Sequence, residues 1–253
     1  MGTATASFDF DRARVLVTGG TSGIGLACAQ GFSEAGAQVT ITGTRSGPGE
    51  YDEDFSDFDY RQLRVTDNDE ILAVANSLSA LDVLVNNAGN VKFAEADSVD
   101  ARVSVFEEMV RVHLISGNNL SEACFDMLAA SDLPGGASVI GIASLTSFMS
   151  NPFVPGYGAG KAGMVQLAKT QAALWSGSGI RSNCVAAGNT STRMTAGVLE
   201  MEELNHAIVE RTPMKRWGEA QEIADAVMFL SCDKASFING ETLVVDGGYL
   251  YNS

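Results

Sequence analysis

The sequence is poor in basic residues, since 16 lysines and arginines stand against 31 aspartates and glutamates. Proteins that bind nucleic acids or anionic membranes need basic patches that neutralise phosphates. A formal net charge of −15 over 253 residues therefore argues against both kinds of partner. We interpret the excess of acid as a solvated surface whose charge repulsion keeps the protein soluble.

Cysteine and histidine are also scarce. The four cysteines are widely separated in the chain, without a C-x-x-C pair, and are Cys28, Cys124, Cys184 and Cys232. Neither histidine lies at metal-ligand spacing from them, so we expect no metal site and no disulfide framework. Reduced thiols are typical of cytoplasmic proteins, and we expect this protein to be cytoplasmic.

Long hydrophobic runs are missing as well. No apolar stretch approaches the ~18 residues that a membrane span requires. Residues 1–12, MGTATASFDFDR, lack a basic segment followed by an apolar core, which argues against a secretory signal peptide. We expect these residues to form a short tail, and we expect no association with a membrane.

What the chain does contain is an alternation of short, β-branched apolar runs with helical patterns. Such runs, apolar on both faces, are typical of a parallel sheet covered by helices. The seven predicted strands are residues 13–18, 37–43, 60–65, 81–87, 137–143, 180–186 and 242–247. The clearest predicted helices are residues 24–36, 68–79 and 159–175.

This alternation predicts the α/β class, with a Rossmann-like, doubly wound parallel sheet and helices on both faces. No proline- or serine-rich linker and no repeat divides the chain, so we expect one domain over residues 1–253. Residues 46–60 carry six acids and break the alternation. We interpret them as an exposed loop in place of a crossover helix.

A glycine-rich stretch, VLVTGGTSGIG, places Gly19, Gly23 and Gly25 between the first strand and the first helix. Without Cβ atoms, this backbone can adopt positive φ and approach a ligand closely. The positive end of the helix dipole suits a pyrophosphate at the same place. The stretch therefore predicts a nucleotide site, with a glycine-lined tight turn as the alternative.

A second constellation combines Tyr157 and Lys161, four residues apart on one helix face, with Ser144 at the end of a strand. An ammonium beside the phenol favours the phenolate, and a serine hydroxyl can steady charge on a substrate oxygen. Nucleophilic serine catalysis is the competing hypothesis, but Ser144 lacks a G-x-S-x-G setting. An exposed Tyr–Lys pair on a helix is the other alternative.

Five motifs occur in one characteristic order: TGGTSGIG, NNAG at 86–89, Ser144, Tyr157-x-x-x-Lys161 and VVDGG at 244–248. In this order and spacing, residues 13–251 resemble the short-chain dehydrogenase/reductase family. The resemblance implies an NAD(P)(H)-dependent oxidoreductase that moves a hydride between the nicotinamide and a carbonyl or secondary alcohol. The glycine spacing is this family's form of the dinucleotide fingerprint.

The resemblance also implies roles for the catalytic residues. Ser144 would hold the substrate oxygen, and Tyr157 would be the general acid in reduction or the general base in oxidation. Lys161 would bind the nicotinamide ribose and lower the pKa of Tyr157. His113 stands where the family has an asparagine that helps to hold a water in a proton relay. It could substitute by titrating near neutrality, or it could be a packed histidine beside a water.

The implied cofactor site follows the same motifs. The glycine stretch would line the pyrophosphate and the adenosine ribose. Asn87, Ala88 and Gly89 would flank the adenosine, and Asn86 would brace Thr18. The loop after the sixth strand, with Gly188, Thr190 and Thr192, would bind the carboxamide of the nicotinamide. The predicted cofactor residues are Gly19, Ser22, Gly23, Ile24, Gly25, Thr44, Arg45, Asn87, Ala88, Gly89, Tyr157, Lys161, Gly188, Thr190 and Thr192.

The end of the second strand bears on the choice of cofactor. NAD-specific relatives place an acid there for the ribose 2′-hydroxyl, whereas this chain has Gly43-Thr44-Arg45. Arg45 could pair with a 2′-phosphate, and Arg64, which replaces a family aspartate, could assist. Two features argue against NADP(H). Many NADP-dependent relatives carry a basic residue at the position of Ser22, and the loop at 46–60 is acidic. We favour NADP(H), with NAD(H) as the alternative.

The substrate is less well defined by the sequence. Six apolar residues flank the site, namely Leu145, Phe148, Met149, Phe153, Met194 and Val198. If about half of them line a pocket, a fairly apolar ketone or secondary alcohol is favoured over a sugar or an acyl-carrier substrate. Residues 193–216 occupy the place of the family's substrate lid, as a mobile cover or as a fixed surface helix. By resemblance we expect a homotetramer.

Two other functions use the same fold. A non-catalytic dinucleotide-binding scaffold or sensor is suggested by His113 and by Ala187, which replaces a family proline. The intact Ser144, Tyr157 and Lys161 count against it. An epimerase or dehydratase would retain its cofactor through the cycle, so net cofactor consumption separates it from a dehydrogenase.

Overall fold

Seven parallel strands form the central sheet of the protein, seen in a computed structural model that describes residues 5–93 and 98–252. The strands are β1 (Arg14–Val17), β2 (Gln38–Gly43), β3 (Asp59–Gln62), β4 (Val83–Asn86), β5 (Ala137–Ser144), β6 (Ile180–Ala187) and β9 (Thr242–Val245). All seven predicted strands are confirmed. Their order across the sheet is β3-β2-β1-β4-β5-β6-β9, which confirms the Rossmann-like fold.

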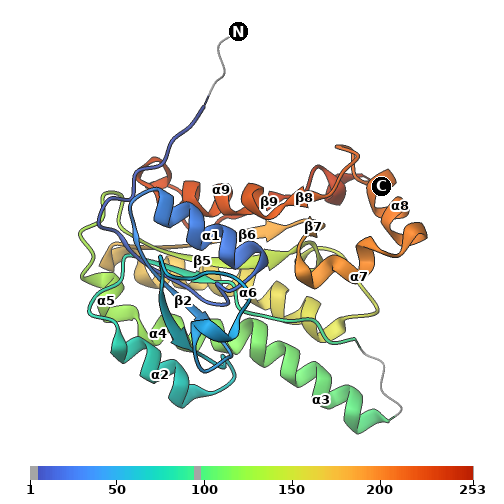
Figure 1. The fold of residues 1–253 in the computed structure, drawn as a ribbon, viewed down its shortest axis with the longest axis horizontal. Coiled ribbons are helices and arrows are strands. Elements are labelled where there is room, and N and C mark those ends of the chain that lie inside the picture. Colours follow the sequence, from blue (N-terminus) through green and yellow to red (C-terminus); the bar gives the residue numbers. More distant parts are fainter. Residues whose placement is uncertain (1–4, 94–97, 253) are drawn as a thin grey trace.

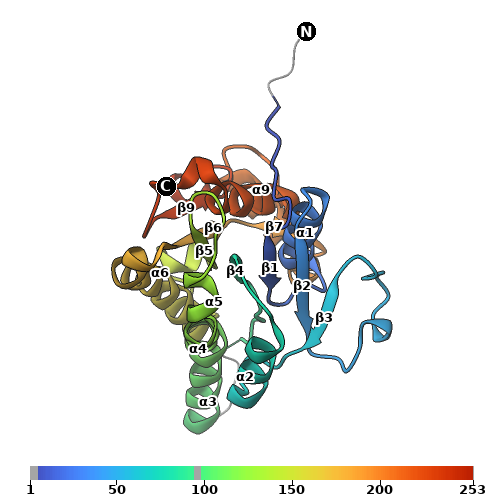
Figure 2. The same cartoon turned by 90° about the vertical axis from the view of Figure 1, so that its left-hand side faces the viewer.

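The order of the strands places a crevice at the centre of the sheet. The chain runs outward from β1 through β2 to β3 and then returns to β4, which pairs with the other side of β1 (Figure 2). At such a reversal the loops after β1 and β4 separate, and α/β proteins bind ligands between them. The residues that follow β1 and β4 are the glycine stretch and NNAG.

Helices cover both faces of this sheet (Figures 1 and 2). One face carries α1 (Gly23–Glu34) and α9 (Ala220–Ser231). The helices on the other side are α2 (Asn68–Ser77), α3 (Val99–Val110), α4 (Ser116–Ala123), α5 (Phe125–Ala129) and α6 (Pro155–Trp175). The three predicted helices correspond to α1, α2 and α6.

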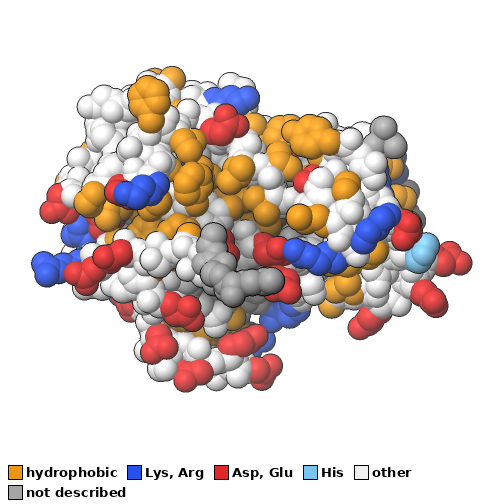
Figure 3. All heavy atoms as spheres, turned by 90° about the horizontal axis from the view of Figure 1, so that it is seen from above, with side chains coloured by type: hydrophobic (Ala, Val, Ile, Leu, Met, Phe, Trp, Pro, Cys, Tyr) orange, Lys and Arg blue, Asp and Glu red, His pale blue; other side chains and the backbone are white. Residues whose placement is uncertain are grey.

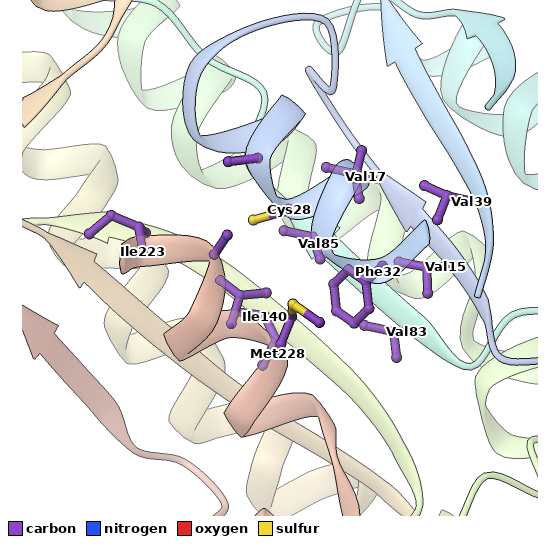
Figure 4. Close-up of a cluster of buried hydrophobic side chains, with 14 of the residues drawn as sticks. Val15, Val17, Cys28, Phe32, Val39, Val83, Val85, Ile140, Ile223 and Met228 are labelled. Atoms are coloured by element: carbon purple, nitrogen blue, oxygen red, sulfur yellow. The ribbon is translucent and has the colours of Figure 1, made fainter. Parts of the chain in front are cut away.

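The strands are apolar on both faces because each face meets a helical layer. In β1, Val15 and Val17 belong to the cluster under α1 and α9, whereas Leu16 belongs to the cluster on the opposite face. Successive side chains of a strand point to opposite faces, which explains this division. Figure 4 shows Phe32 of α1 and Met228 of α9 meeting the valines of the strands.

Local sequence determines where the helices begin and end. The side chain of Asp67 accepts hydrogen bonds from the backbone N–H groups of Asp69 and Glu70 and so caps α2. Pro155 occupies the first turn of α6, where its missing N–H costs nothing. After α1 the chain turns at Gly36, whose φ of +92° is accessible to glycine.

Two segments depart from their predicted form. The connection at 46–60 contains no crossover helix, as expected, and has a single 3₁₀ turn, Pro48–Glu50. It is not wholly exposed, because Phe55 is buried in the core below α1. The tail at 1–12 is docked from Phe8 onward, since Phe10 packs against Phe32, while residues 1–4 lie outside the described residues.

The segment at 193–216 lies between the two strands of a small parallel sheet that the sequence did not predict. This sheet pairs β7 (Thr190–Ser191) with β8 (Gly218–Glu219). Between them lie α7 (Ala196–Leu199) and α8 (Glu202–Arg211), at one end of the molecule (Figure 1). The helical pattern ends before Pro213, as predicted.

The surface reflects the acidic composition. On the face shown in Figure 3, acidic side chains gather along the lower edge, and hydrophobic side chains surround the centre. No helix in the described part of the chain is long and apolar enough to cross a lipid bilayer.

Candidate active site

A cavity of about 610 Å³ opens at the carboxyl ends of β1, β2 and β4. Among its lining residues are ten of the predicted cofactor residues, namely Gly19, Ser22, Gly23, Ile24, Thr44, Arg45, Asn87, Ala88, Gly89 and Thr192. The crevice of the sheet therefore brings together residues from four separate parts of the chain.

The glycines of the first turn are required by close packing. Gly19 and Gly23 have φ values of +65° and +55°, which side chains disfavour. A Cβ on Gly25 would overlap the carbonyl oxygen of Gly19, and one on Gly19 would lie 2.9 Å from the Cα of Ala88. The first turn of α1 thus lies directly against the turns after β1 and β4, with its N-terminus at the cavity.

Thr18 and Asn87 tie these two turns together. The Thr18 hydroxyl accepts hydrogen bonds from the backbone N–H groups of Asn87 and Ala88, both at 3.0 Å. The Asn87 side chain donates to the carbonyl oxygen of Thr18 at 2.8 Å. The expectation that Asn86 braces Thr18 is wrong. Asn86 donates to Ser121 of α4 instead, because neighbouring residues of a strand face opposite sides of the sheet.

The predicted catalytic residues converge next to this cavity. None of the four is among its described lining residues, and a hydrogen bond of His113 connects them to the lining residue Asn90. Ser144 ends β5, Tyr157 and Lys161 lie in the first turns of α6, and His113 lies in a π-helical segment, Arg111–Ile115, between α3 and α4. The rings of His113 and Tyr157 have centroids 4.7 Å apart, and the Nζ of Lys161 lies 5.6 Å from the Tyr157 centroid. A sequence separation of 48 residues between His113 and Lys161 is thus closed by the packing of α6 on this segment.

The electrostatics of Tyr157 differ from the expectation. Burial raises the pKa of Tyr157, and a hydrogen bond with the Ser144 side chain opposes this rise. The buried Lys161 ammonium donates to the carbonyl oxygen of Ile142 at 2.5 Å. Desolvation lowers the pKa of Lys161 itself to about 8. The predicted lowering of the Tyr157 pKa by Lys161 is therefore not what this arrangement produces.

His113 does not titrate near neutrality. Its ring is buried, and Nε2 lies 2.7 Å from the carbonyl oxygen of Asn90. A carbonyl only accepts hydrogen bonds, so Nε2 carries the hydrogen. Desolvation and the nearby Lys161 charge lower the pKa of His113 to about 3. The side chain is neutral at physiological pH, which corrects the expectation of a titrating relay group.

The loop after β6 is anchored although it lacks the family proline. Ala187 pairs with Val245 of β9, and the N–H of Gly188 donates to the carbonyl oxygen of Val245 at 2.9 Å. The Thr190 hydroxyl donates to the carbonyl oxygen of Gly188 at 3.0 Å. Gly188 and Thr190 are not among the residues that line the cavity, whereas Thr192 is.

The structure adds cavity residues that the sequence did not indicate as site residues. Arg193 donates from Nη2 to the Ser22 hydroxyl at 3.3 Å, so it reaches the start of α1 from a distant part of the chain. In the sequence, only the position of Arg193 directly after the predicted cofactor residue Thr192 could have indicated it as a site residue. Tyr51 comes from the acidic loop and gives no signal of its own. Among the described lining residues, Arg45, Arg64 and Arg193 stand against one acid, Glu108.

Comparisons with known proteins agree with this geometry. A family model described as enoyl-(acyl carrier protein) reductase matches residues 19–250. Gluconate 5-dehydrogenase of Gluconobacter oxydans is 30% identical over 253 residues, which cover 95% of this chain and 96% of the relative. The 2-dehydro-3-deoxy-D-gluconate 5-dehydrogenase of Bacillus subtilis is 32% identical over 259 residues, with 99% of each chain covered.

A solved structure shows the same fold with a ligand present. The gluconate 5-dehydrogenase of Burkholderia cenocepacia J2315, in complex with NADP and tartrate, is 30% identical and has a TM-score of 0.85. The similarity covers 97% of this chain and 98% of that one. These matches support an oxidoreductase over a scaffold or an epimerase. The chain belongs to the short-chain dehydrogenase/reductase family, as an NAD(P)(H)-dependent oxidoreductase that acts on CH–OH or C=O groups.

Proposed function

We propose that this enzyme interconverts a fairly apolar ketone and its secondary alcohol, with NADP(H) as the preferred coenzyme and Ser144, Tyr157 and Lys161 as catalytic residues. The observation that carries the proposal is the convergence of these three side chains beside the glycine-lined cavity. When bound, the nicotinamide supplies or accepts the hydride. The protein's own residues bind, orient and move the proton.

The cavity fits a dinucleotide. The close packing at Gly19 and Gly25 leaves bare backbone at the N-terminus of α1, whose first turn reads GIGL. Unpaired N–H groups and the positive end of the helix dipole favour a pyrophosphate there. Asn87, Ala88 and Gly89 would flank the adenosine, and Thr192 would lie toward the nicotinamide. For Gly188 and Thr190 the proposed role is to shape the loop that carries Thr192.

The charges of the cavity favour NADP(H). The end of β2 carries Thr44 and Arg45 where an NAD-specific protein would carry an acid. A guanidinium can pair with a 2′-phosphate through two parallel hydrogen bonds, which an ammonium cannot match. In a protein of net charge −15, the cavity lining carries three arginines against Glu108. Arg64 is ion-paired with Glu70, so Arg45 and Arg193 supply the positive charge of this cavity. NAD(H) is the alternative coenzyme.

The proton chemistry follows from the positions of the three side chains. In reduction the Tyr157 phenol donates a proton to the carbonyl oxygen, and in oxidation the phenolate takes it back. The Ser144 hydroxyl donates a hydrogen bond to the same oxygen and stabilises the charge that develops there. The Lys161 ammonium, 5.6 Å from the centroid of the Tyr157 ring, is proposed to bind the ribose hydroxyls of the coenzyme rather than to lower the pKa of Tyr157.

Exposed apolar residues that follow Ser144 and Thr192 in the chain support an apolar substrate, and Met194 among them lines the cavity. Phe148, Phe153 and Met194 are 46%, 70% and 56% exposed and are free to meet a ligand. Leu145 is buried, so it fills the core, as expected for part of this set. The second candidate substrate is a polyhydroxy acid, because the names of the relatives from Gluconobacter oxydans and Bacillus subtilis refer to gluconates. The substrate panel below includes both classes.

We also propose a single domain, a homotetramer and a cytoplasmic location. One sheet joins both ends of the chain, which supports a single domain. Exposed Val99, Val103 and Phe106 along α3 support an interface there, since contiguous apolar surface marks contacts between proteins. The four cysteines are free thiols, which suits a reducing compartment. Residues 193–216 are proposed to cover the site, because Arg193 and Met194 line the cavity.

The test measures oxidation of NADPH and of NADH by absorbance, with ketones of graded bulk, and reduction of NADP⁺ with gluconate. Tyr157→Phe should lower kcat by at least ~100-fold, because proton transfer by a positioned acid contributes about 10²–10⁴-fold. NADP⁺ should still bind to this variant, because Tyr157 is only one of the proposed coenzyme contacts. Tyr251→Phe, at an exposed tyrosine, is the matched control. Full turnover in Tyr157→Phe would contradict the assignment.

A further inference from the structure

The connection between β2 and β3 contributes a tyrosine to the cofactor cavity. Residues 44–58, all of which the structure describes, contain no α-helix and extend from the edge of the sheet beyond β3 (Figure 2). The acids Asp52, Glu53, Asp54 and Asp57 are exposed, and none of them lines the cavity. The loop contributes Thr44, Arg45 and Tyr51 to the lining. Its negative charge thus faces solvent, while a cation and an aromatic ring face the cavity.

Two tyrosines hold Arg45 at three points. The Arg45 guanidinium lies over the ring of Tyr51, with Cζ 4.5 Å from the ring centroid. The backbone N–H of Arg45 donates to the Tyr51 hydroxyl at 3.1 Å, and the Tyr60 hydroxyl donates to the Arg45 carbonyl oxygen at 2.5 Å. Both backbone polar groups and the side chain of Arg45 are therefore held by these tyrosines.

The same hydroxyls meet at the last residue of β2. The two tyrosine oxygens lie 3.3 Å apart, and the Tyr51 hydroxyl occupies the space that a side chain on Gly43 would need. A Cβ on Gly43 would also lie 2.8 Å from Cγ2 of Thr21. Gly43 is thus required for the tyrosines to reach the end of β2. The group there that can donate hydrogen bonds to a phosphate is the Arg45 guanidinium, because the Tyr60 hydroxyl already donates to the Arg45 carbonyl oxygen.

We propose that Tyr51 is a positioning residue for coenzyme selection, which together with Tyr60 holds the Arg45 guanidinium for the 2′-phosphate of NADP(H). This role rests on the proposed preference for NADP(H) and names the part of the chain that produces it. A free arginine side chain loses much rotamer entropy when it binds a ligand, whereas a stacked one has lost part of it already. Stacking covers one face of the guanidinium and leaves its N–H edge for the phosphate.

The experiment measures the Kd of NADP⁺ and of NAD⁺ by calorimetry, so that it does not depend on turnover. Arg45→Leu should weaken NADP⁺ binding at least ~10-fold and change NAD⁺ binding less than about twofold. Tyr51→Leu should weaken NADP⁺ binding about three- to tenfold with little change for NAD⁺. In the Arg45→Leu background, Tyr51→Leu should have no further effect, because Tyr51 acts through Arg45.

A matched control breaks an equivalent stack elsewhere. The guanidinium of Arg211 lies 4.4 Å from the ring centroid of Tyr249. Neither residue is among the described residues that line the cofactor cavity. Tyr249→Leu should leave both Kd values unchanged. Tyr51→Phe and Tyr60→Phe keep the aromatic packing, including the contact of Tyr51 with Phe55. If Tyr51→Leu does not fold, these two variants decide, and each should weaken NADP⁺ binding alone by about twofold.

The outcomes separate the two proposals. Wild-type protein that binds NAD⁺ as tightly as NADP⁺ would contradict the proposed coenzyme preference and, with it, the role of Tyr51. Wild-type preference for NADP⁺ that the Tyr51 and Tyr60 variants leave intact would overturn the positioning role alone. Equal weakening of both coenzymes, or an undiminished effect of Tyr51→Leu in the Arg45→Leu background, would reduce Tyr51 to a structural residue.

Discussion

The ring of His113 packs against the ring of Tyr157, with centroids 4.7 Å apart and planes inclined at 83°. The same imidazole binds the carbonyl oxygen of Asn90, a residue of the cavity lining. One neutral side chain therefore joins the proposed general acid to the cofactor cavity. A buried histidine with one bonded nitrogen restrains the tyrosine by packing rather than by charge.

The burial of His113 makes stability depend on pH. Its pKa falls from an ordinary value near 6.5 to about 3 in the folded protein, so only the unfolded chain gains this proton between those values. The free energy of unfolding that neutral His113 contributes is fully present above pH 6.5 and is lost as the pH falls toward 3. Between pH 7 and pH 5 the wild type should lose about 2 kcal/mol through this group.

Denaturant unfolding at both pH values checks this expectation. His113→Asn should lose less stability on acidification than the wild type, since it has no such proton to gain. His206→Asn, at the exposed histidine, should behave like the wild type. Equal acid sensitivity of His113→Asn and wild type would show that His113 is not buried as a neutral group.

The depressed pKa of Lys161 predicts a pH limit on reduction. Desolvation brings this pKa to about 8, so the ammonium charge disappears as the pH rises through this value. We expect kcat/KM for ketone reduction to fall above about pH 8, because this parameter reports the free enzyme's essential groups. Lys161→Arg retains the charge and should move the fall to higher pH at lower activity. Lys169→Arg, on the exposed face of α6, should leave the profile unchanged.

Gly25→Ala should damage both stability and coenzyme binding. The new methyl group would overlap the carbonyl oxygen of Gly19, and backbone cannot move aside as a flexible side chain can. Overpacking of this kind costs about 1–3 kcal/mol. Gly177→Ala is the matched control, because nothing lies within 4 Å of its Cβ position. Thermal unfolding and NADP⁺ titration of both variants measure the effect, and equal results for the two would contradict the close packing.

Asp82→Asn should strongly destabilise the fold without touching the site. The buried carboxylate accepts hydrogen bonds from the backbone and the guanidinium of Arg14 at 2.8–3.0 Å and from Ser131 at 2.5 Å. Burial acts to raise the pKa of Asp82, but the hydrogen bonds from Arg14 and Ser131 together outweigh it and hold the pKa below its usual range. Because the Arg14 side chain is 36% exposed, breaking this pair should lower the free energy of unfolding by about 1–3 kcal/mol.

The neighbouring Asp132 provides the control for Asp82. Its exposed carboxylate lies 3.9 Å from the same arginine, so Asp132→Asn should change stability by less than about 0.5 kcal/mol. The Asp82 contribution is present at neutral pH and is lost as the pH falls through the folded pKa, because protonation removes the charge that Arg14 binds. Urea unfolding at pH 7 compares the two variants directly.

Much of the site was predictable because its parts are local. The turn residues Gly19 and Gly23 and the NNAG segment each follow a strand whose apolar pattern is unmistakable, and parallel strands bring their carboxyl ends to one edge. Tyr157 and Lys161 share a helix face through their spacing alone. Such relations depend on a few residues of regular backbone, which the residue pattern specifies.

Other features were not predictable, because they arise between distant segments. Arg193 reaches Ser22 across 171 residues, and Tyr51 enters the cavity from a loop that has neither an α-helix nor a strand. The sequence left open whether His113 titrates or packs, and the expected bracing by Asn86 was wrong, for the same reason. Each depends on which groups surround the side chain after packing, and desolvation cannot be read from residue order.

By itself the sequence determined the α/β class, the seven strands, the glycine-lined turn and the identity of the proposed catalytic residues. Periodicity and motif spacing act over short stretches of backbone, so they carry this information directly. Only the tertiary structure decided that His113 is neutral, that Asn87 rather than Asn86 binds Thr18, and that Tyr51 holds Arg45. Burial and contact set these properties, and both exist only once the chain has folded.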